Sequence, residues 1–267
     1  MISLPDIDPI MTVNDLSIIY SSYGEKKKAV DKISFDLKRG EILGIVGESG
    51  AGKSTIAKAV MGLIEPPSYA TGEIIYNGKN LIGMQNYRIN RIRWNKITMI
   101  FQASMNSLNP VQTVESNFIS IMKDKMGITD KSQWNSIIDE MLVSVSLPVD
   151  VKKKFPHQLS GGMRQRILIS MAMITNPEIV IADEPTTALD VITEFYVLSV
   201  LKKRISRSGA SMIFITHDLP AIVFMANRLA VMRDGRIVEM GDVSKILSNP
   251  ENEYTKKLVN SFYEVEK

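Results

Sequence analysis

The chain has 267 residues, of which 45% are hydrophobic and 23% charged, an ordinary balance for a globular protein. Its 32 basic and 29 acidic residues leave a formal charge of only +3, which argues against the dense basic stripe of a nucleic-acid-binding domain. The absence of cysteine excludes disulfides, thiolate zinc sites and cysteine-bound iron–sulfur clusters. No apolar run approaches the ~20 residues that a membrane-spanning helix needs, so we expect the chain not to cross a bilayer by itself.

Strand signals dominate the first hundred residues after a short tail. Residues 1–10 carry two prolines and two aspartates without a clear period, and we expect a loose tail there. The run 41–46 is continuously apolar, which indicates a strand buried on both faces of a parallel sheet. Asn77-Gly78 and Asp234-Gly235 predict hairpin turns. The expected main strands are 11–20, 29–37, 41–46, 96–101, 178–183 and 211–218.

Helical spacing dominates the segment from 111 to 175, which lacks strong strand signals. The end of the chain, 242–267, is expected to be helical and exposed. Because strands alternate with helices along the chain, we expect an α/β sheet with covered faces. The expected helices are 114–126, 132–145, one that follows the glycine pair Gly161-Gly162, 191–207 and 242–267.

A phosphate-binding loop is predicted between the apolar strand 41–46 and the amphipathic run that follows it. The pattern is Gly47-x-x-x-x-Gly52-Lys53-Ser54, in the strand–loop–helix context that the mechanism requires. Gly47, Gly50 and Gly52 let the backbone curl so that successive N–H groups point inward, and the following helix adds its positive N-terminal end. We expect Lys53 to reach the β- and γ-phosphates of a nucleotide and the Ser54 hydroxyl to bind Mg²⁺.

Polar side chains follow three further predicted strands. Asp183, at the end of an apolar strand, suits Mg²⁺, and Glu184 beside it can polarise an attacking water. Gln102 can reach both the metal and the water, and His217 can donate to the γ-phosphate. A lone glutamine or histidine is more often structural. Ligands of open α/β sheets bind at the carboxyl ends of strands, however, which favours one shared site.

The glycine pair within LSGGMRQR (159–166) falls where a helix should begin, although glycine in a helix costs about 1 kcal/mol relative to alanine. Together with GESGAGKST (47–55) and IVIADEPTTALD (179–190), this stretch resembles the ATP-binding-cassette family, for which LSGG is the specific mark. The resemblance covers roughly residues 11–260. It implies that Ser160 caps the helix and that the bare glycine backbone closes on the γ-phosphate bound to a second ATPase subunit.

The resemblance also implies the layout of the nucleotide site. Two ATP molecules would lie between two cassettes in head-to-tail arrangement, with Asp190 at their seam and Gln158 beside the signature glycines. Tyr20 would stack on adenine, with Tyr23 as the second choice. Glu184, His217, Gln102 and Lys53 would be the catalytic residues, and Ser54, Gln102 and Asp183 the Mg²⁺ ligands. The nucleotide contacts implied by the motif are Gly47, Ser49, Gly50, Ala51, Gly52, Lys53, Ser54 and Thr55.

The fold implied by the resemblance is a P-loop NTPase (RecA-like) α/β core with an antiparallel β subdomain and an inserted α-helical subdomain. The core with its β subdomain would comprise 11–110 and 176–241, and the insertion with the signature motif 111–175. Residues 1–10 would form a flexible tail and 242–267 a C-terminal helical tail.

A finer resemblance points to the importer branch for oligopeptides, dipeptides and nickel. It is carried by FQASMNSLNP (101–110) and FPHQLSGGMRQR (155–166), and by NPENEYTKKL (249–258), in which Glu253 stands where the branch usually has proline. It implies hydrolysis of ATP to ADP and phosphate at the cytoplasmic face of a membrane. The implied partners are a second, non-identical cassette, two transmembrane permease subunits and, indirectly, an extracytoplasmic solute-binding protein, with no nucleic acid.

Other readings of the same motifs stay open. The cassette could serve an importer of sugars or nickel, or an exporter, although FQASMNSLNP argues against the exporter. A soluble cassette acting on DNA or ribosomes usually has two cassettes, long coiled coils or zinc cysteines, which this chain lacks. The motifs identify neither the transported solute nor whether the partner cassette is identical.

Overall fold

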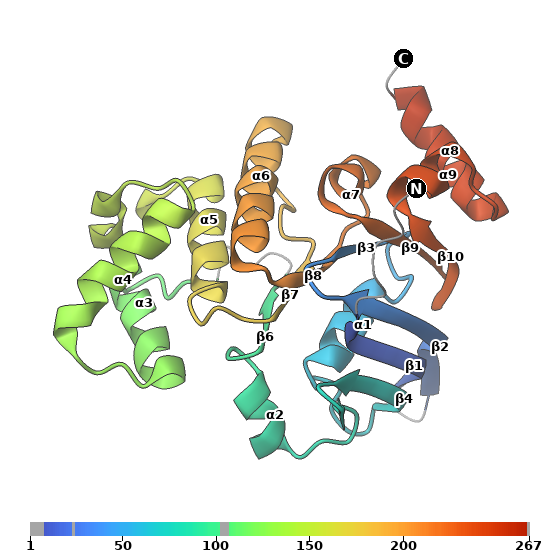
Figure 1. Ribbon diagram of the computed structural model, residues 1–267, viewed down its shortest axis with the longest axis horizontal. Coiled ribbons are helices and arrows are strands. Elements are labelled where there is room, and N and C mark those ends of the chain that lie inside the picture. Colours follow the sequence, from blue (N-terminus) through green and yellow to red (C-terminus); the bar gives the residue numbers. More distant parts are fainter. Residues whose placement is uncertain (1–7, 23–24, 102–106, 266–267) are drawn as a thin grey trace. The chain divides into compact units, whose positions relative to one another are not determined.

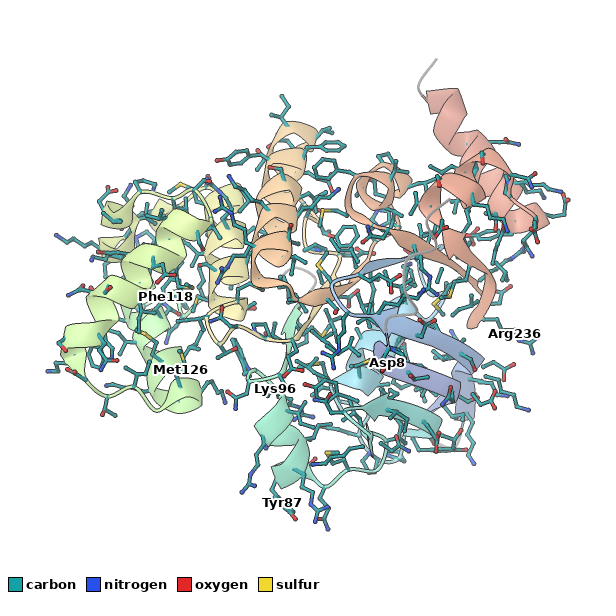
Figure 2. All side chains as sticks on the ribbon, viewed as in Figure 1. Asp8, Tyr87, Lys96, Phe118, Met126 and Arg236 are labelled. Atoms are coloured by element: carbon teal, nitrogen blue, oxygen red, sulfur yellow. The ribbon has the colours of Figure 1, made fainter. Side chains whose placement is uncertain are left out.

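The computed structural model describes residues 8–22, 25–101 and 107–265, and the chain forms two compact units (Figure 1). The first unit comprises Met1–Asn90 and Ser211–Lys267, and the second comprises Arg91–Ala210. Helix α2 (Asn86–Ile92) lies where the chain passes from one unit to the other. Its Tyr87 side chain points outward and is 55% exposed (Figure 2).

The first unit contains an antiparallel sheet in the strand order β2-β1-β4-β5. Both long strands predicted near the start of the chain are present, and β1 pairs with β2 and β4. The predicted Asn77-Gly78 hairpin is confirmed, since both residues have positive φ, at 47° and 70°, and they join β4 to β5. The strands are β1 (Pro9–Ser22), β2 (Glu25–Lys38), β4 (Tyr69–Tyr76) and β5 (Lys79–Asn80).

A second group of strands in the first unit surrounds β3, which pairs in parallel with β8 on one side and β9 on the other. Every residue of β3 and β8 is buried, as the continuous apolar runs predicted. The Asp234-Gly235 hairpin is confirmed, with φ of 49° and 77°, and it joins β9 to antiparallel β10. These strands are β3 (Ile42–Val46), β8 (Ser211–Ile215), β9 (Arg228–Arg233) and β10 (Arg236–Asp242).

Helices α1, α7, α8 and α9 also belong to the first unit, besides the part of α2 that falls within it. Helix α1 follows β3 through the predicted phosphate loop, and α7 follows β8. The C-terminal segment is helical, as predicted, but the expectation that it is exposed was wrong, because Tyr254, Thr255 and Val259 are buried. These apolar and hydroxyl groups recur on one face of the last helix, so that face packs on the sheet while the other meets water. The helices are α1 (Lys53–Val60), α7 (Leu219–Met225), α8 (Val243–Ser248) and α9 (Glu253–Val265).

The second unit contains the parallel pair β6–β7 and a set of helices. Thr113 and Asp130 cap α3 and α4 by accepting hydrogen bonds from the backbone two or three residues on, as expected at helix starts. Phe118 is fully buried among the helices (Figure 2). The elements are β6 (Ile97–Ile100), α3 (Val114–Ile121), the π-helical turn η2 (Met122–Met126), α4 (Lys131–Ser144), the 3₁₀ turns η3 (Val149–Lys153) and η4 (Pro156–Gln158), α5 (Gly161–Ala172), β7 (Ile179–Asp183) and α6 (Val191–Ser208).

The observed elements match the predicted α/β class, with an antiparallel sheet, parallel strands and a helical segment between β6 and β7. The predicted limits of the functional subdomains stay predictions. The compact units divide the chain elsewhere, because β6, β7 and α6 group with the helical segment. Strand β1 begins at Pro9, inside the segment expected to be a tail, and residues 1–7 lie outside the described residues. No helix in the described part of the chain has the length and apolar character needed to cross a membrane.

An ionic cluster in the first unit joins β9 to β2 and to Glu41, the residue before β3. Arg228 donates to Asp36 at 3.2 and 3.3 Å and to Glu41 at 3.1 and 3.3 Å, and Glu41 is 7% exposed. Burial acts to lower the pKa of the Arg228 guanidinium, but the hydrogen bonds to Asp36 and the charge of Glu41 outweigh it and raise the pKa above its ordinary value. The positive charge of Arg228 therefore balances the negative charge of the buried Glu41 carboxylate.

We expect Arg228→Ala to lower the free energy of unfolding by roughly 2–4 kcal/mol, because it leaves the Glu41 carboxylate buried without its cation. Arg236→Ala is the matched control: Arg236 pairs with Asp31 at 2.6 Å, but its side chain is 69% exposed, so its loss should cost less than about 1 kcal/mol. Urea unfolding of the two variants measures the difference. Equal losses would contradict the importance of the buried carboxylate.

Candidate functional site

The phosphate loop in the first unit is held against backbone carbonyls. A Cβ on Gly47 would lie 2.2 Å from the carbonyl oxygen of Met232, and one on Gly52 would lie 2.4 Å from that of Ala29. Gly52 also has φ of +100° and Gly50 has φ of +85°, in the region that favours glycine. Space therefore excludes a side chain at Gly47 and Gly52, and backbone conformation disfavours one at Gly50 and Gly52, as a phosphate cradle requires.

Lys53 begins α1 and folds back over the loop. Its side chain is buried, and Nζ donates hydrogen bonds to the carbonyl oxygens of Gly47 at 2.6 Å and Glu48 at 2.9 Å. Gly52 precedes the helix and has no side chain to cap it, so the first backbone N–H groups of α1 are not capped by the residue at this position. The ammonium group and the helix start together place positive charge at the loop.

Other predicted site residues of the first unit lie beside this loop. His217 follows β8 and lines a cavity of ≈ 530 Å³ together with Gly47, Glu48 and Ser49. The Tyr20 hydroxyl lies 3.5 Å from Oγ1 of Thr55 in α1, which brings the proposed adenine platform next to the helix that follows the loop. Tyr23, the second choice for this role, lies outside the described residues.

In the second unit, the predicted acids lie at the end of β7. Asp183 is the last residue of the strand and is 4% exposed. Glu184 follows with φ of +45°, an uncommon conformation for a residue with a side chain, and such strain is concentrated at functional sites. The Thr187 hydroxyl lies 3.1 Å from both the backbone oxygen and Oε2 of Glu184. Gln102 lies outside the described residues.

The signature stretch forms the start of α5. Ser160 caps the helix, as predicted, by accepting a hydrogen bond from the Met163 N–H at 3.3 Å. Gln158 Oε1 accepts from the Phe155 N–H at 2.8 Å and thereby closes the turn that leads into the motif. The Ser160 hydroxyl hydrogen is still available to donate, because capping uses only an oxygen lone pair.

Gly162 is also required by packing inside the unit. A Cβ there would lie 2.5 Å from Cγ2 of Thr193 in the first turn of α6. The Thr193 N–H donates to Asp190 Oδ1 at 3.0 Å, and the Thr193 hydrogen bonds hold the pKa of the Asp190 carboxyl below its usual value. The signature glycine and the residue expected at the dimer seam are therefore linked through Thr193, an internal reason for glycine that the sequence reasoning missed.

Sequence reasoning also missed side chains of the C-terminal segment at the phosphate loop. Arg233, Tyr254 and Lys257 line the same cavity as Gly47 and His217. The only sequence signal was the stretch 249–258, to which no role was assigned. A sequence pattern of this kind does not show which part of the protein α9 packs against.

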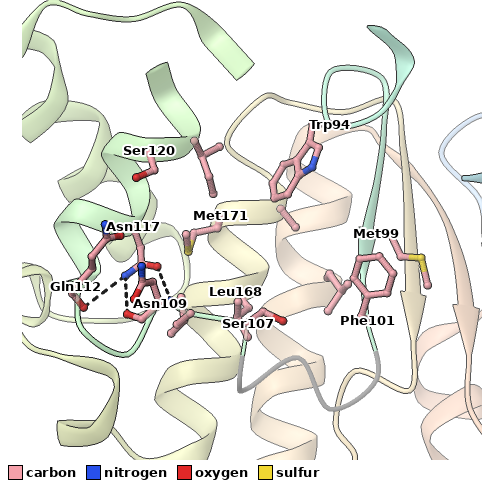
Figure 3. Close-up of a pocket in the computed structure, with 14 residues that line it drawn as sticks. Trp94, Met99, Phe101, Ser107, Asn109, Gln112, Asn117, Ser120, Leu168 and Met171 are labelled. Carbon is pink, nitrogen blue, oxygen red and sulfur yellow. Dashed lines mark hydrogen bonds between the residues drawn. The ribbon is translucent and has the colours of Figure 1, made fainter. Parts of the chain in front are cut away.

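A separate groove of ≈ 460 Å³ lies within the second unit (Figure 3). Trp94, Leu168 and Met171 are among its apolar lining residues, and Phe101 at its edge is 45% exposed. Asn117 fixes one side: its Nδ2 lies 2.9 Å from the oxygen of Thr113, and its Oδ1 accepts from the N–H of Asn109 at 2.9 Å. The backbone of Asn109 is thus hydrogen-bonded to α3.

Comparison with known proteins agrees with this geometry. The model of the ABC transporter family matches residues 30–187, more than half of the chain. The chain therefore belongs to the ABC transporter family, and it is an ATPase cassette of that family, with ATP as its ligand.

Individual relatives cover most of this chain. An oligopeptide transport ATP-binding protein, OppD of Bacillus subtilis, is 41% identical over 256 residues, covering 94% of this chain and 71% of OppD. A peptidoglycan transport ATP-binding protein, YejF of Agrobacterium fabrum, is 40% identical over 94% of this chain, which spans only 46% of YejF. A cassette solved as a dimer in a post-hydrolysis state with ADP and phosphate has a TM-score of 0.76 at 28% identity, covering 87% of this chain and 98% of its own.

Whether packing against Thr193 requires glycine at position 162 can be tested without nucleotide. We expect Gly162→Ala to destabilise the protein by about 1 kcal/mol, because the contact with the Thr193 methyl outweighs the better helix propensity of alanine. Thr193→Ser removes only that methyl group, so the double variant should regain wild-type stability in thermal unfolding. Thr193→Ser alone is the control, and a double variant no more stable than Gly162→Ala would contradict the packing explanation.

Proposed function

We propose that this chain is the ATP-hydrolysing subunit of an importer for peptides, working at the cytoplasmic face of a membrane. The observation that carries the proposal is the glycine-rich phosphate loop, in which the Met232 and Ala29 carbonyls leave no room for side chains at Gly47 and Gly52 and which the buried Lys53 follows. The 41% identity with an oligopeptide transport ATP-binding protein supports peptides as the solute. The full assembly and its substrate are part of the proposal.

The phosphate loop would bind the triphosphate through its backbone amides. Lys53 would exchange its bonds to the Gly47 and Glu48 carbonyls for bonds to the β- and γ-phosphates, since a phosphate oxygen is the stronger acceptor for an ammonium group. His217 would donate to the γ-phosphate in the cavity that it lines together with Ser49. The remaining proposed nucleotide contacts are Tyr20 on adenine and Gly50, Ala51, Gly52, Ser54 and Thr55.

The residue types fit Mg²⁺ bound together with the nucleotide. The described residues contain no group of three or more acidic or histidine side chains that could hold a metal alone. Mg²⁺ is usually held by one or two protein oxygens plus phosphates and waters, and Ser54, Asp183 and Gln102 are the proposed ligands. The ion would neutralise charge on the transferring phosphoryl group. Glu184 would orient and deprotonate the attacking water, so that positioning and electrostatics carry the reaction.

The signature helix would act on the nucleotide of a second cassette. Ser160 and the backbone of Gly161 and Gly162 lie at the positive end of α5, where an anion is stabilised. Gln158, which shapes the turn before the motif, and Asp190, which caps α6, would lie at the same seam. Binding of ATP would draw the two cassettes together, and hydrolysis would release them. We favour a non-identical partner cassette.

The groove of Figure 3 would receive a short segment of a permease subunit. Its lining is largely apolar, Phe101 is exposed at its edge, and Val111 nearby along the chain is 80% exposed. Exposed apolar surface around a concave site is typical of a docking surface. Two permease subunits, and through them an extracytoplasmic solute-binding protein, complete the proposed assembly. The helical insertion, 111–175, would pass the motion driven by ATP binding and hydrolysis to the permease, with Gln102 as the joint between the nucleotide site and the insertion.

An importer of sugars or nickel would use the same cassette chemistry, and only the partners would differ. A non-transport cassette is disfavoured by the absence of zinc cysteines and coiled-coil heptads. Co-purification of the chain with membrane proteins, rather than with nucleic acid or ribosomes, separates these classes.

Two substitutions should separate binding of ATP from its turnover. Glu184→Gln should lower ATP hydrolysis by about 10²–10⁴-fold, because it removes the general base, while leaving ATP affinity intact. Lys53→Ala should instead weaken ATP binding itself. Isothermal titration and phosphate-release assays measure the two effects. If Glu184→Gln hydrolyses ATP at the wild-type rate, Glu184 is not the general base. If Lys53→Ala binds ATP with unchanged affinity, the proposed role of Lys53 and the phosphate loop in binding ATP is wrong.

Placing a charge in the groove should uncouple the chain from the membrane. We expect Phe101→Asp to reduce the membrane-bound fraction about tenfold in cells that contain the permease, as for loss of a central aromatic contact, without changing ATP affinity. Tyr87→Asp is the matched control, since Tyr87 is an equally exposed aromatic that does not line the groove. Fractionation of membranes measures both. Equal retention of the two variants would exclude the groove as the docking surface.

A further inference from the structure

The C-terminal helix α9 is fastened to the first unit at its start. The Glu239 carboxylate on β10 accepts hydrogen bonds from the N–H groups of Glu251 at 2.9 Å and Asn252 at 3.0 Å. Burial acts to raise the pKa of Glu239, but these backbone bonds and the Thr255 hydroxyl outweigh it and hold the pKa below its ordinary value. The fully buried Thr255 and Val259 complete the docking face.

Tyr254, in the first turn of α9, reaches the strand end that shapes the phosphate loop. Its side chain is 8% exposed, and the Arg233 guanidinium lies 5.0 Å from the centre of its ring. Arg233 follows Met232, whose carbonyl excludes any side chain at Gly47. The tyrosine ring therefore packs on the same end of β9 that closes the loop.

Helix α9 and the phosphate loop line the same cavity. Glu48 and Ser49 line this cavity from the loop, and Tyr254, Lys257 and Ser261 line it from α9. Residues of the C-terminal segment thus share a cavity with residues of the phosphate loop, although about two hundred positions separate them along the chain.

The Tyr254 hydroxyl is the group that needs an explanation. Its oxygen is buried and forms no hydrogen bond of good geometry within the described residues, although the backbone and the carboxylate of Glu48 both lie near enough to influence its pKa. Burial raises the pKa of this phenol, and the negative charge of Glu48 raises it further, so Glu48 lies close enough to act on the hydroxyl. A buried donor without a partner is unfavourable. A small movement of the loop would pair it with the Glu48 carboxylate.

We propose that Tyr254 is a positioning residue for ATP binding: its hydroxyl donates to Glu48 when the phosphate loop closes on the triphosphate, so that docked α9 tightens nucleotide binding. The inference rests on the proposed role of this loop as the ATP site. Tyr254 touches no phosphate and acts only through the backbone turn at Glu48.

The test is ATP binding to the full chain, measured by isothermal titration. Tyr254→Phe keeps the ring on Arg233 and removes only the hydroxyl, and it should raise the Kd for ATP about tenfold, as for loss of one hydrogen bond to a charged group. The same substitution in a Glu48→Gln background should have a smaller effect, because the two residues act as one pair. A role in packing alone predicts the opposite: Tyr254→Phe would leave the Kd within about twofold of wild type and would raise the melting temperature by removing the unpaired hydroxyl.

Val259→Ala is the matched control, since Val259 lies on the buried face of α9 but does not line the cavity. It should lower the melting temperature and leave the Kd unchanged. An unchanged Kd for Tyr254→Phe, or an equal effect with and without Glu48→Gln, would overturn the inference. Failure of the unmodified chain to bind ATP would instead be failure of the proposed function.

Discussion

The close approach of two backbone carbonyls to the phosphate loop is the constraint on which the rest of the site depends. Met232 and Ala29 occupy the space where side chains of Gly47 and Gly52 would be. Because a carbonyl of β9 and a carbonyl of β2 pack against the loop at Gly47 and Gly52, only glycine fits at these two positions. Lys53 in addition bonds to two loop carbonyls. Binding of phosphate would then require few backbone changes, which keeps the entropic cost of binding low.

Four helix starts in the described part of the chain differ in one respect that matters for the binding of anions. Ser160, Asp190 and Asp218 cap α5, α6 and α7, and each accepts a bond from a backbone N–H in the first turn. Helix α1 begins after Gly52, which has no side chain to offer. The amides of α1 therefore lack the competitor that the other helices have, and carboxylate caps at α6 and α7 would repel phosphate. These caps support the proposed binding of phosphate at α1, and the neutral hydroxyl cap of α5 is compatible with the proposed approach of an anion there.

Local signals in the sequence predicted the elements well, because period, turn residues and caps are local physics. The apolar run 41–46 identified a buried parallel strand, and Asn77-Gly78 and Asp234-Gly235 identified both hairpins. Long-range packing was not predictable in the same way. The burial of Tyr254 and the contact between Gly162 and Thr193 depend on which elements meet, and spacing along one chain contains no direct signal for that. The sequence accordingly located the phosphate loop and predicted the C-terminal helix, but it did not show that this helix lies beside the loop.

The packing of Gly162 changes how the signature motif should be understood. If glycine at position 162 served only the approach of a nucleotide, the start of α5 would need no close contact with α6, and the two helices could move independently. Instead its backbone lies against Thr193, whose N–H is held by Asp190, and Arg166 of α5 lies over the ring of Tyr196 of α6 at 4.9 Å. Close packing of this kind resists sliding, since interiors transmit displacement rather than absorb it. The starts of α5 and α6 should therefore move as one body, so that closure of a partner on the glycines would carry Asp190 with them.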